Sequence, residues 1–170
     1  DGCGPLGALG DVDVSNDVIS AGNTVYLNGN DDINVDALVS GGGANLTETI
    51  GNINISATGN IEVTGTAYLT ANTTINQGGN ITAGTANLTA GSDIVQAGAG
   101  TITAGNVVLT ADGGSIGASG LGNAIELGGT DTNLTANANL TTGNVYVNAG
   151  SGNVTLVGDS GAGNAFELTA

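Results

Sequence analysis

The chain of 170 residues contains no lysine, arginine or histidine, while its 15 aspartate and glutamate residues give it a formal charge of −15. Without a basic group it has nothing to hold a phosphate, so nucleic acid is excluded as a partner. An anionic membrane surface would repel the chain. No apolar stretch is long enough to span a bilayer, and we expect no membrane insertion.

Thiols and aromatic rings are also scarce. Cys3 is the single cysteine, and the aromatic residues are three tyrosines and one phenylalanine. A thiol-poor chain fits an exported protein. Cys3 is interpreted as an inert thiol, with an intermolecular disulfide or an attachment point as the alternative. So few rings indicate a core of stacked aliphatic side chains.

Glycine is abundant, at 32 residues, and the apolar fraction is 39%. Apolar and polar residues alternate, as in NINIS at 52–56 and NIEVT at 60–64. This period of two is typical of half-buried strands. Glycine, asparagine, threonine and valine disfavour helix. The pattern therefore predicts an all-β fold.

The sequence repeats itself at intervals of about 20 residues. The segment TAGTANLTA at 82–90 returns as TAGNVVLTA at 103–111, and an earlier copy is VTGTAYLTA at 63–71. Marker leucines continue the series at Leu27, Leu46, Leu69, Leu88, Leu109, Leu134 and Leu156. Such a period, with strand alternation inside it, predicts one solenoid turn per repeat. We expect one β-solenoid domain over 1–170 with seven to eight turns, less regular at 1–49 and clear at 50–170.

Each turn has room for about three short strands, such as 67–71, 74–76 and 80–82, joined by bends at glycine and asparagine. Leucine, isoleucine and valine should stack inside. Threonine and asparagine should stack outside, where asparagine amides can hydrogen-bond along the rod axis. The runs 40–44 and 118–129 are expected to be loops that leave the regular coil.

The segment TAGNVVLTADGGSIGASG at 103–120 resembles the repeats of filamentous-haemagglutinin-like exoproteins, which are giant adhesins exported by two-partner secretion. Similar segments occur at 82–94 and 141–156, and the resemblance covers residues 50–170. It implies a right-handed parallel β-helix, a secreted or cell-surface location, and an adhesive or scaffolding role in which surface glycans are candidate partners. The conserved secretion domain of that family is not recognisable in the chain, which leaves the export route open.

Carboxylates are the main candidates for acid–base chemistry in a chain without histidine, lysine or arginine. They are scattered, and no repeat position is shared by Glu48, Glu62, Glu126 and Glu167. We therefore expect no enzyme and no cofactor other than calcium. Two groups of acidic residues could supply the oxygen ligands that calcium prefers. The first aspartate cluster is Asp11, Asp13 and Asp17, and the second is Asp31, Asp32 and Asp36; the alternative is a solvated acidic surface.

Eight N-x-S/T sequons are candidate glycosylation sites in a glycosylating host, although strand alternation also produces this pattern. They begin at Asn45, Asn54, Asn72, Asn80, Asn87, Asn133, Asn139 and Asn153.

The tyrosines precede marker positions, at Tyr26, Tyr68 and Tyr146, and should therefore point outward where the marker points inward. Outward aromatic rings on a polar rod could form contacts. The alternative function to a structural fibre is a surface-binding module for carbohydrate or ice. Ice-binding solenoids need T-x-T pairs in successive turns, but the pairs at 64–66 and 101–103 do not recur in register.

The last segment, Phe166, Glu167, Leu168, Thr169 and Ala170, is predicted to be a strand that runs to the last residue with no cap after it. The open ends of a solenoid carry unpaired N–H and C=O groups. A head-to-tail contact that does not close generates a filament. We therefore expect the chain to associate with itself end to end, or to be part of a longer rod, as a component of an extracellular filament or giant surface adhesin.

Overall fold

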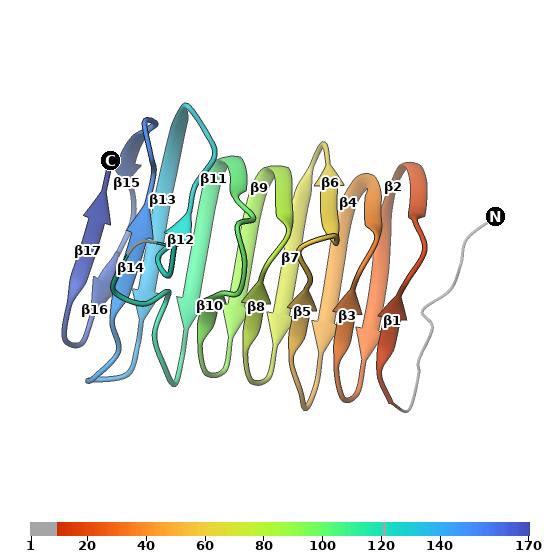
Figure 1. The fold of residues 1–170 in the computed structure, drawn as a ribbon, viewed down its shortest axis with the longest axis horizontal. Coiled ribbons are helices and arrows are strands. Elements are labelled where there is room, and N and C mark those ends of the chain that lie inside the picture. The colour runs from red at the N-terminus through yellow and green to blue at the C-terminus, as the bar shows by residue number, and fades with distance from the viewer. Residues whose placement is uncertain (1–9, 121) are drawn as a thin grey trace.

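The computed structural model describes residues 10–120 and 122–170, and in them every regular element is a β-strand. The strands stack along one axis into a rod of about seven turns (Figure 1). All-β solenoid architecture was predicted from the repeats and is confirmed. No helix long and apolar enough to cross a membrane occurs in the described part of the chain. Cys3 lies outside the described residues.

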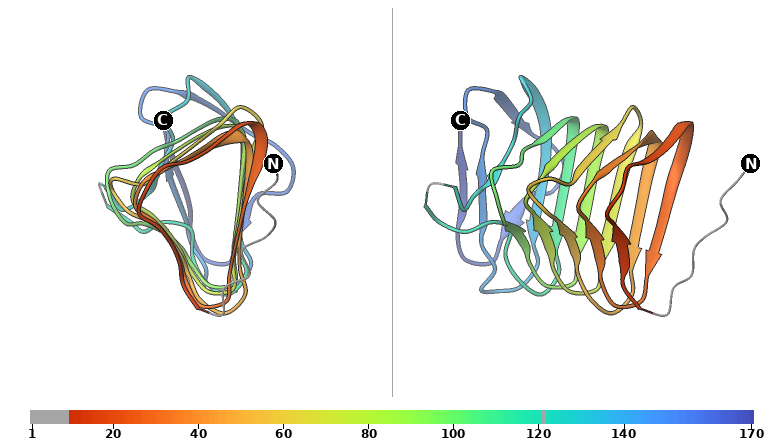
Figure 2. Two further views of the ribbon diagram at one scale, coloured as in Figure 1. Left: turned by 90° about the vertical axis from the view of Figure 1, so that its right-hand side faces the viewer. Right: turned by 45° about the vertical axis from the view of Figure 1, so that its right-hand side comes forward.

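Each turn is roughly triangular in cross-section, as the left view of Figure 2 shows. In that view the N-terminal turns are nearest, and the chain runs clockwise as it recedes, so the solenoid is right-handed. One side of the triangle, the short-strand face, is a sheet of five parallel three-residue strands. These are β1 (Val12–Val14), β3 (Ile33–Val35), β5 (Ile53–Ile55), β8 (Ile75–Gln77) and β10 (Ile94–Gln96). A three-stranded sheet continues this face toward the C-terminus, with β12 (Ile125–Glu126), β14 (Val145–Asn148) and β17 (Phe166–Thr169).

A larger parallel sheet covers the other two sides, because its longest strands bend at a corner of the triangle (Figure 2). Its strands are β2 (Val18–Gly29), β4 (Leu38–Glu48), β6 (Asn60–Val63), β7 (Thr66–Ala71), β9 (Asn80–Ala90), β11 (Ile102–Ala111), β13 (Asp131–Ala138), β15 (Asn153–Leu156) and β16 (Gly161–Ala162). The repeat glycines lie at this corner, where the N–H of Gly84 donates to the carbonyl of Gly65 at 2.8 Å. The loop expected at 40–44 is wrong, because these glycines form the same corner within β4.

The marker leucines are equivalent from turn to turn, as the repeats predicted. Leu69 pairs with Leu88, and Leu88 pairs with Leu109. The positions assigned to Leu134 and Leu156 are wrong by two residues. Leu109 pairs with Ala136, whereas Leu134 pairs with Val107 and with Leu156. A shift of two keeps the side chain pointing to the same side of a strand, so Leu134 is still buried.

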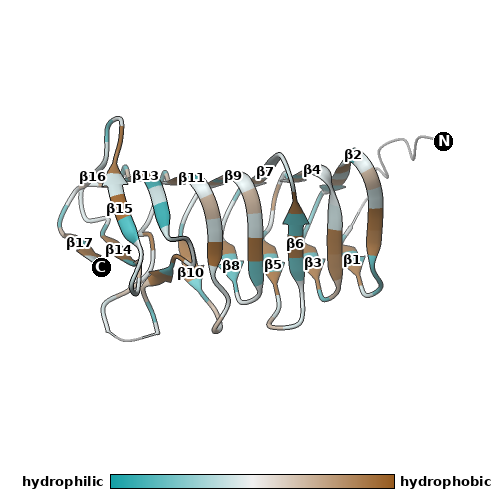
Figure 3. Cartoon of the chain, turned by 90° about the horizontal axis from the view of Figure 1, so that it is seen from above, coloured by the Kyte–Doolittle hydropathy of each residue, from teal (hydrophilic) through white to brown (hydrophobic). Residues whose placement is uncertain are grey.

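The core is a set of aliphatic ladders along the rod axis. In the described residues, every buried hydrophobic side chain is valine, leucine, isoleucine or alanine. Similar hydropathy recurs on neighbouring strands from one turn to the next (Figure 3). Burying each leucine or isoleucine contributes roughly 1.5–3 kcal/mol, and the contribution repeats with every turn. A core of stacked aliphatic side chains was predicted and is confirmed for the described residues.

One loop interrupts the short-strand face. Ile116 bridges to Val145, and Ile125 pairs with Val147. The step from 116 to 125 is nine residues, but the matching step in the next turn, from 145 to 147, is only two. Seven residues therefore loop out of the coil. Three glycines of this excursion, at 117, 120 and 122, have φ of +64°, +99° and +77°, which side chains rarely adopt. The sequence placed a loop here, at 118–129, but the chain returns to strand at β12.

Candidate functional site

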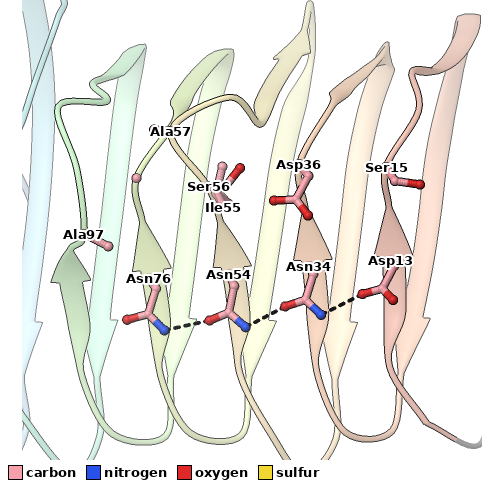
Figure 4. Close-up of a pocket in the computed structure, with 11 residues that line it drawn as sticks. Asp13, Ser15, Asn34, Asp36, Asn54, Ile55, Ser56, Ala57, Asn76 and Ala97 are labelled. Atoms are coloured by element: carbon pink, nitrogen blue, oxygen red, sulfur yellow. Dashed lines mark hydrogen bonds between the residues drawn. The ribbon is translucent and has the colours of Figure 1, made fainter.

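A ladder of hydrogen-bonded side chains runs along the outward side of the short-strand face (Figure 4). Asn34 Nδ2 donates to Asp13 Oδ1 at 2.7 Å, and Asn54 Nδ2 donates to Asn34 Oδ1 at 2.8 Å. Asn76 Nδ2 then donates to Asn54 Oδ1 at 2.7 Å. The next position in register is Val95, which ends the ladder. Asparagine ladders along the axis were predicted and are confirmed.

The ladder forms the floor of a shallow groove of about 540 Å³. The groove is also lined by the hydroxyls of Ser15 and Ser56 and by the carboxylate of Asp36 (Figure 4). Its polar groups are amides, hydroxyls and two carboxylates, and the sequence has no basic group to add to them. Chemically the groove is a row of hydrogen-bonding groups with negative charge at the N-terminal end.

The aspartates of the first cluster bond to the neighbouring turn. Asp11 Oδ1 accepts from the N–H of Asp32 at 3.1 Å, and Asp17 Oδ1 accepts from the N–H of Leu38 at 3.1 Å. In the second cluster, Asp32 Oδ1 accepts from the N–H of Asn52 at 2.7 Å. These carboxylates therefore tie successive turns together at the corners of the solenoid.

Neither aspartate cluster is gathered into one compact group. Over residues 10–120 and 122–170, no set of three histidine, cysteine, aspartate or glutamate side chains is placed to hold a metal ion. Asp13 and Asp36, from different clusters, do line the same groove. Calcium binding by the two clusters stays a prediction, which a chelation experiment tests.

The eight sequon asparagines differ in exposure. Those that are exposed are Asn72, Asn80, Asn133, Asn139 and Asn153, whereas Asn45, Asn54 and Asn87 are half-buried. Asn54 is the least suited to carry a glycan, because its amide both donates and accepts within the ladder. Glycosylation at the other positions stays a prediction.

Glu48 is an inward-pointing carboxylate in an otherwise aliphatic column, and 2% of its surface is exposed. Its Oε1 accepts from the N–H groups of Ile50 at 2.7 Å and Gly51 at 2.9 Å. Its Oε2 is buried and has no hydrogen-bond partner. The sequence contains no basic side chain that could neutralise it. Leaving a buried polar atom unsatisfied costs stability, so this position is a weak point of the fold.

Two other carboxylates, those of Glu126 and Glu167, line one hollow of about 250 Å³ beside the excursion loop. Asn148 Nδ2 donates to Glu126 Oε2 at 2.8 Å. The sequence did not reveal this grouping, because the seven extra residues change the register between turns. The signal that could have found it is the unusually wide marker spacing around 118–129.

The strand predicted at the end of the chain is present. It is β17, which pairs with β14 and forms the outer strand of its sheet. Its inward residues Phe166 and Leu168 are only half-buried, although they pack against the core. In the same last turn, Leu156 is 49% exposed and Val157 is 38% exposed. The last turn therefore presents incompletely covered apolar residues along its outer edge.

Tyrosine and threonine recur on the outward side of the large sheet. Tyr26 and Tyr68 are 56% and 49% exposed, as predicted. Tyr146 also alternates with buried residues, Val145 and Val147, but it is half-buried and lies on the short-strand face. The T-x-T pairs indeed fail to recur. Instead one threonine per turn forms a ladder, in which the members paired in succession are Thr47, Thr70, Thr89 and Thr110.

Comparison of the chain with protein-family models, with curated proteins and with solved structures found no match in any of the three. The resemblance of residues 50–170 to filamentous-haemagglutinin-like repeats stays a prediction from the sequence motifs.

Proposed function

We propose that the chain is a non-enzymatic structural component of an extracellular filament or giant surface adhesin, and that its solenoid stacks end to end. The observation that carries the proposal is the outer edge of the last turn. Leu156 and Phe166 there are partly open to solvent, whereas Leu88 in an inner turn is fully buried. Another turn of the same shape would cover them.

The geometry of stacking favours such an addition. Every turn of the rod pairs with the next through parallel strands in register, about 4.8 Å apart. The outer edge of β17 and β15 offers unpaired backbone groups in the same arrangement. A further turn can pair with this edge whether it belongs to the same polypeptide or to a second copy. Since the contact is head to tail, it propagates into a filament.

Charge sets the conditions for assembly. Two chains that each carry a formal charge of −15 repel one another, and this repulsion acts over roughly 10 Å at 0.1 M salt. End contacts should therefore form more readily at higher salt. The scarcity of thiols and the motif resemblance support a secreted or cell-surface location.

The test is light scattering of the 170-residue chain over a range of protein and salt concentrations. We expect the scattering mass to rise with salt, and deletion of 166–170 to remove the rise. A matched control is Thr89→Asp, which adds charge to a lateral face without touching either end. A chain that stays monomeric at high protein and salt concentration, with β17 protected from hydrogen exchange, would contradict end-to-end assembly.

A surface-binding module is a second candidate, and the threonine ladder on the large sheet favours it. Four hydroxyl-bearing residues repeat there at the strand spacing, beside exposed tyrosines. Regular polar faces of this kind suit extended, repetitive ligands such as carbohydrate or ice. Thermal hysteresis of the purified chain tests ice binding directly.

A further inference from the structure

One face of this highly acidic rod carries no charge. It is formed by the outward side of the second halves of β2, β4, β9 and β11, together with β7, and we call it the uncharged face. Its residues are the alternate positions of 24–28, 43–47, 66–70, 85–89 and 106–110, which are held in register. All of them are threonine, asparagine, tyrosine, glycine or valine, so none of the acidic residues within 10–120 and 122–170 belongs to this face.

Two aromatic rings stand out from this face. Tyr26 and Tyr68 occupy the same column, with Asn45 on the strand between them. They are therefore two strand spacings apart, about 9.6 Å. Both rings are about half exposed, at 56% and 49%. Tyrosine presents an apolar ring and a polar tip, a combination that is enriched at binding surfaces.

Hydroxyl groups lie in a neighbouring column, beside the column that holds the two rings. Thr47 and Thr70 lie two residues along from Asn45 and Tyr68 on the same outward side. The Oγ1 of Thr47 donates to Asn45 Oδ1 at 3.0 Å, which orients that amide and leaves its two N–H donors available to a ligand. The face thus combines two apolar platforms with a line of hydrogen-bonding groups.

We propose that the uncharged face binds a neutral, linear polysaccharide lying along the rod axis. Tyr26 and Tyr68 stack against sugar rings that are separated by roughly the length of a disaccharide, and the threonine ladder hydrogen-bonds to the hydroxyls. A neutral polymer avoids the repulsion that the acidic chain exerts on anionic polysaccharides. The inference deepens the second candidate function by naming its ligand class and is independent of filament assembly.

The size of the face argues against a second copy of the chain as its occupant. Five strands spaced about 4.8 Å apart, each contributing five residues of about 3.3 Å, give a patch of roughly 400 Å². Stable protein partners usually bury about 800 Å² each. Lateral pairing would also bring together two chains with a charge of −15. The projecting tyrosines interrupt the flat array that ice would need.

The experiment is calorimetric titration of the intact chain with cellohexaose, xylohexaose and mannohexaose, with hexagalacturonate as the anionic comparison. We expect at least one neutral hexaose to bind and the anionic one not to bind. Tyr26→Ala and Tyr68→Ala should each weaken binding by roughly tenfold. Tyr68→Phe should retain most of the affinity, because the ring is kept. Tyr146→Ala is the matched control and should bind like the unmodified chain, with circular dichroism confirming that each variant is folded.

Three results would overturn the inference. One is the absence of binding to every neutral hexaose at millimolar concentration. Another is equal affinity in the two tyrosine-to-alanine variants and the unmodified chain. The third is light scattering that shows these variants lose a lateral self-association, which would make the face a contact between copies. Thermal hysteresis without glycan binding would support a surface-binding function and refute only the proposal that the ligand is a polysaccharide.

Discussion

Replacing Leu88 with aspartate tests the inward register at the centre of the rod. The Leu88 side chain is fully buried and lies between Leu69 and Leu109 in neighbouring turns. The adjacent Asn87 points outward on the uncharged face, where its neighbours in register are Tyr68 and Val108. A carboxylate is thus introduced into an aliphatic column in one variant and onto a solvated surface in the other.

The expected costs differ by several kcal/mol. Leu88→Asp loses about 1.5–3 kcal/mol of apolar burial and adds several kcal/mol for desolvating a charge that has no partner. The sum is comparable to the whole stability of a typical domain, about 5–15 kcal/mol, so we expect the fold to be lost at pH 7. Asn87→Asp should change the free energy of unfolding by less than about 0.5 kcal/mol.

The assay is urea denaturation followed by far-ultraviolet circular dichroism. Leu88→Asn is the matched control, because it keeps the shape of the new side chain without its charge. Burial raises the pKa of an introduced carboxyl above its unfolded value, so the folded variant binds more protons. Its deficit relative to the unmodified chain should therefore grow as pH rises above about 4 and shrink below that value. Equal losses in the variants at 87 and 88 would refute the assigned register.

Three further predictions concern polar groups. Asn54→Ala, which removes both the donor and the acceptor in the middle of the amide ladder, should lower the free energy of unfolding by about 1–2 kcal/mol, and Asn76→Ala at the ladder's end by about half as much; equal losses in urea titration would argue against a continuous ladder. Glu48→Gln should stabilise the fold by about 1 kcal/mol or more at neutral pH, because it removes a buried charge whose Oε2 has no partner; a lower melting temperature would contradict this. If the aspartate clusters bind calcium in the native state, the ion should raise the melting temperature, and an unchanged melt in excess chelator would remove that prediction.

The repeat pattern was sufficient to predict the fold class and most of the core. Leucine at Leu46, Leu69 and Leu88 is followed each time by threonine, and strand alternation then places one inside and the other outside. The same L-T pairs already contained the signal for the threonine ladder. The outward stacking of threonine was predicted and is confirmed, and it takes the form of one threonine per turn.

Register after an irregular turn was not predictable in the same way. Between Leu109 and Leu134 the seven-residue excursion separates residues that the solenoid later realigns, and counting from leucine to leucine then errs by two. A shift of two residues in the pairing register keeps every side chain on the same side of its strand, so the hydrophobic pattern cannot reveal the shift. The shared hollow of Glu126 and Glu167 depends on this realignment, and for that reason only the structure revealed it.

The direction of the backbone hydrogen bonds has a mechanical consequence. Because neighbouring turns are joined by bonds that lie along the rod axis, a force that pulls on the two ends loads the bonds of one turn at a time and peels the rod open. A turn of 21 residues, such as that from Val12 to Ile33, would release roughly 70 Å of extended chain. Under tension the solenoid should therefore lengthen in a series of similar steps, absorbing work at each one, and behave as an extensible tether.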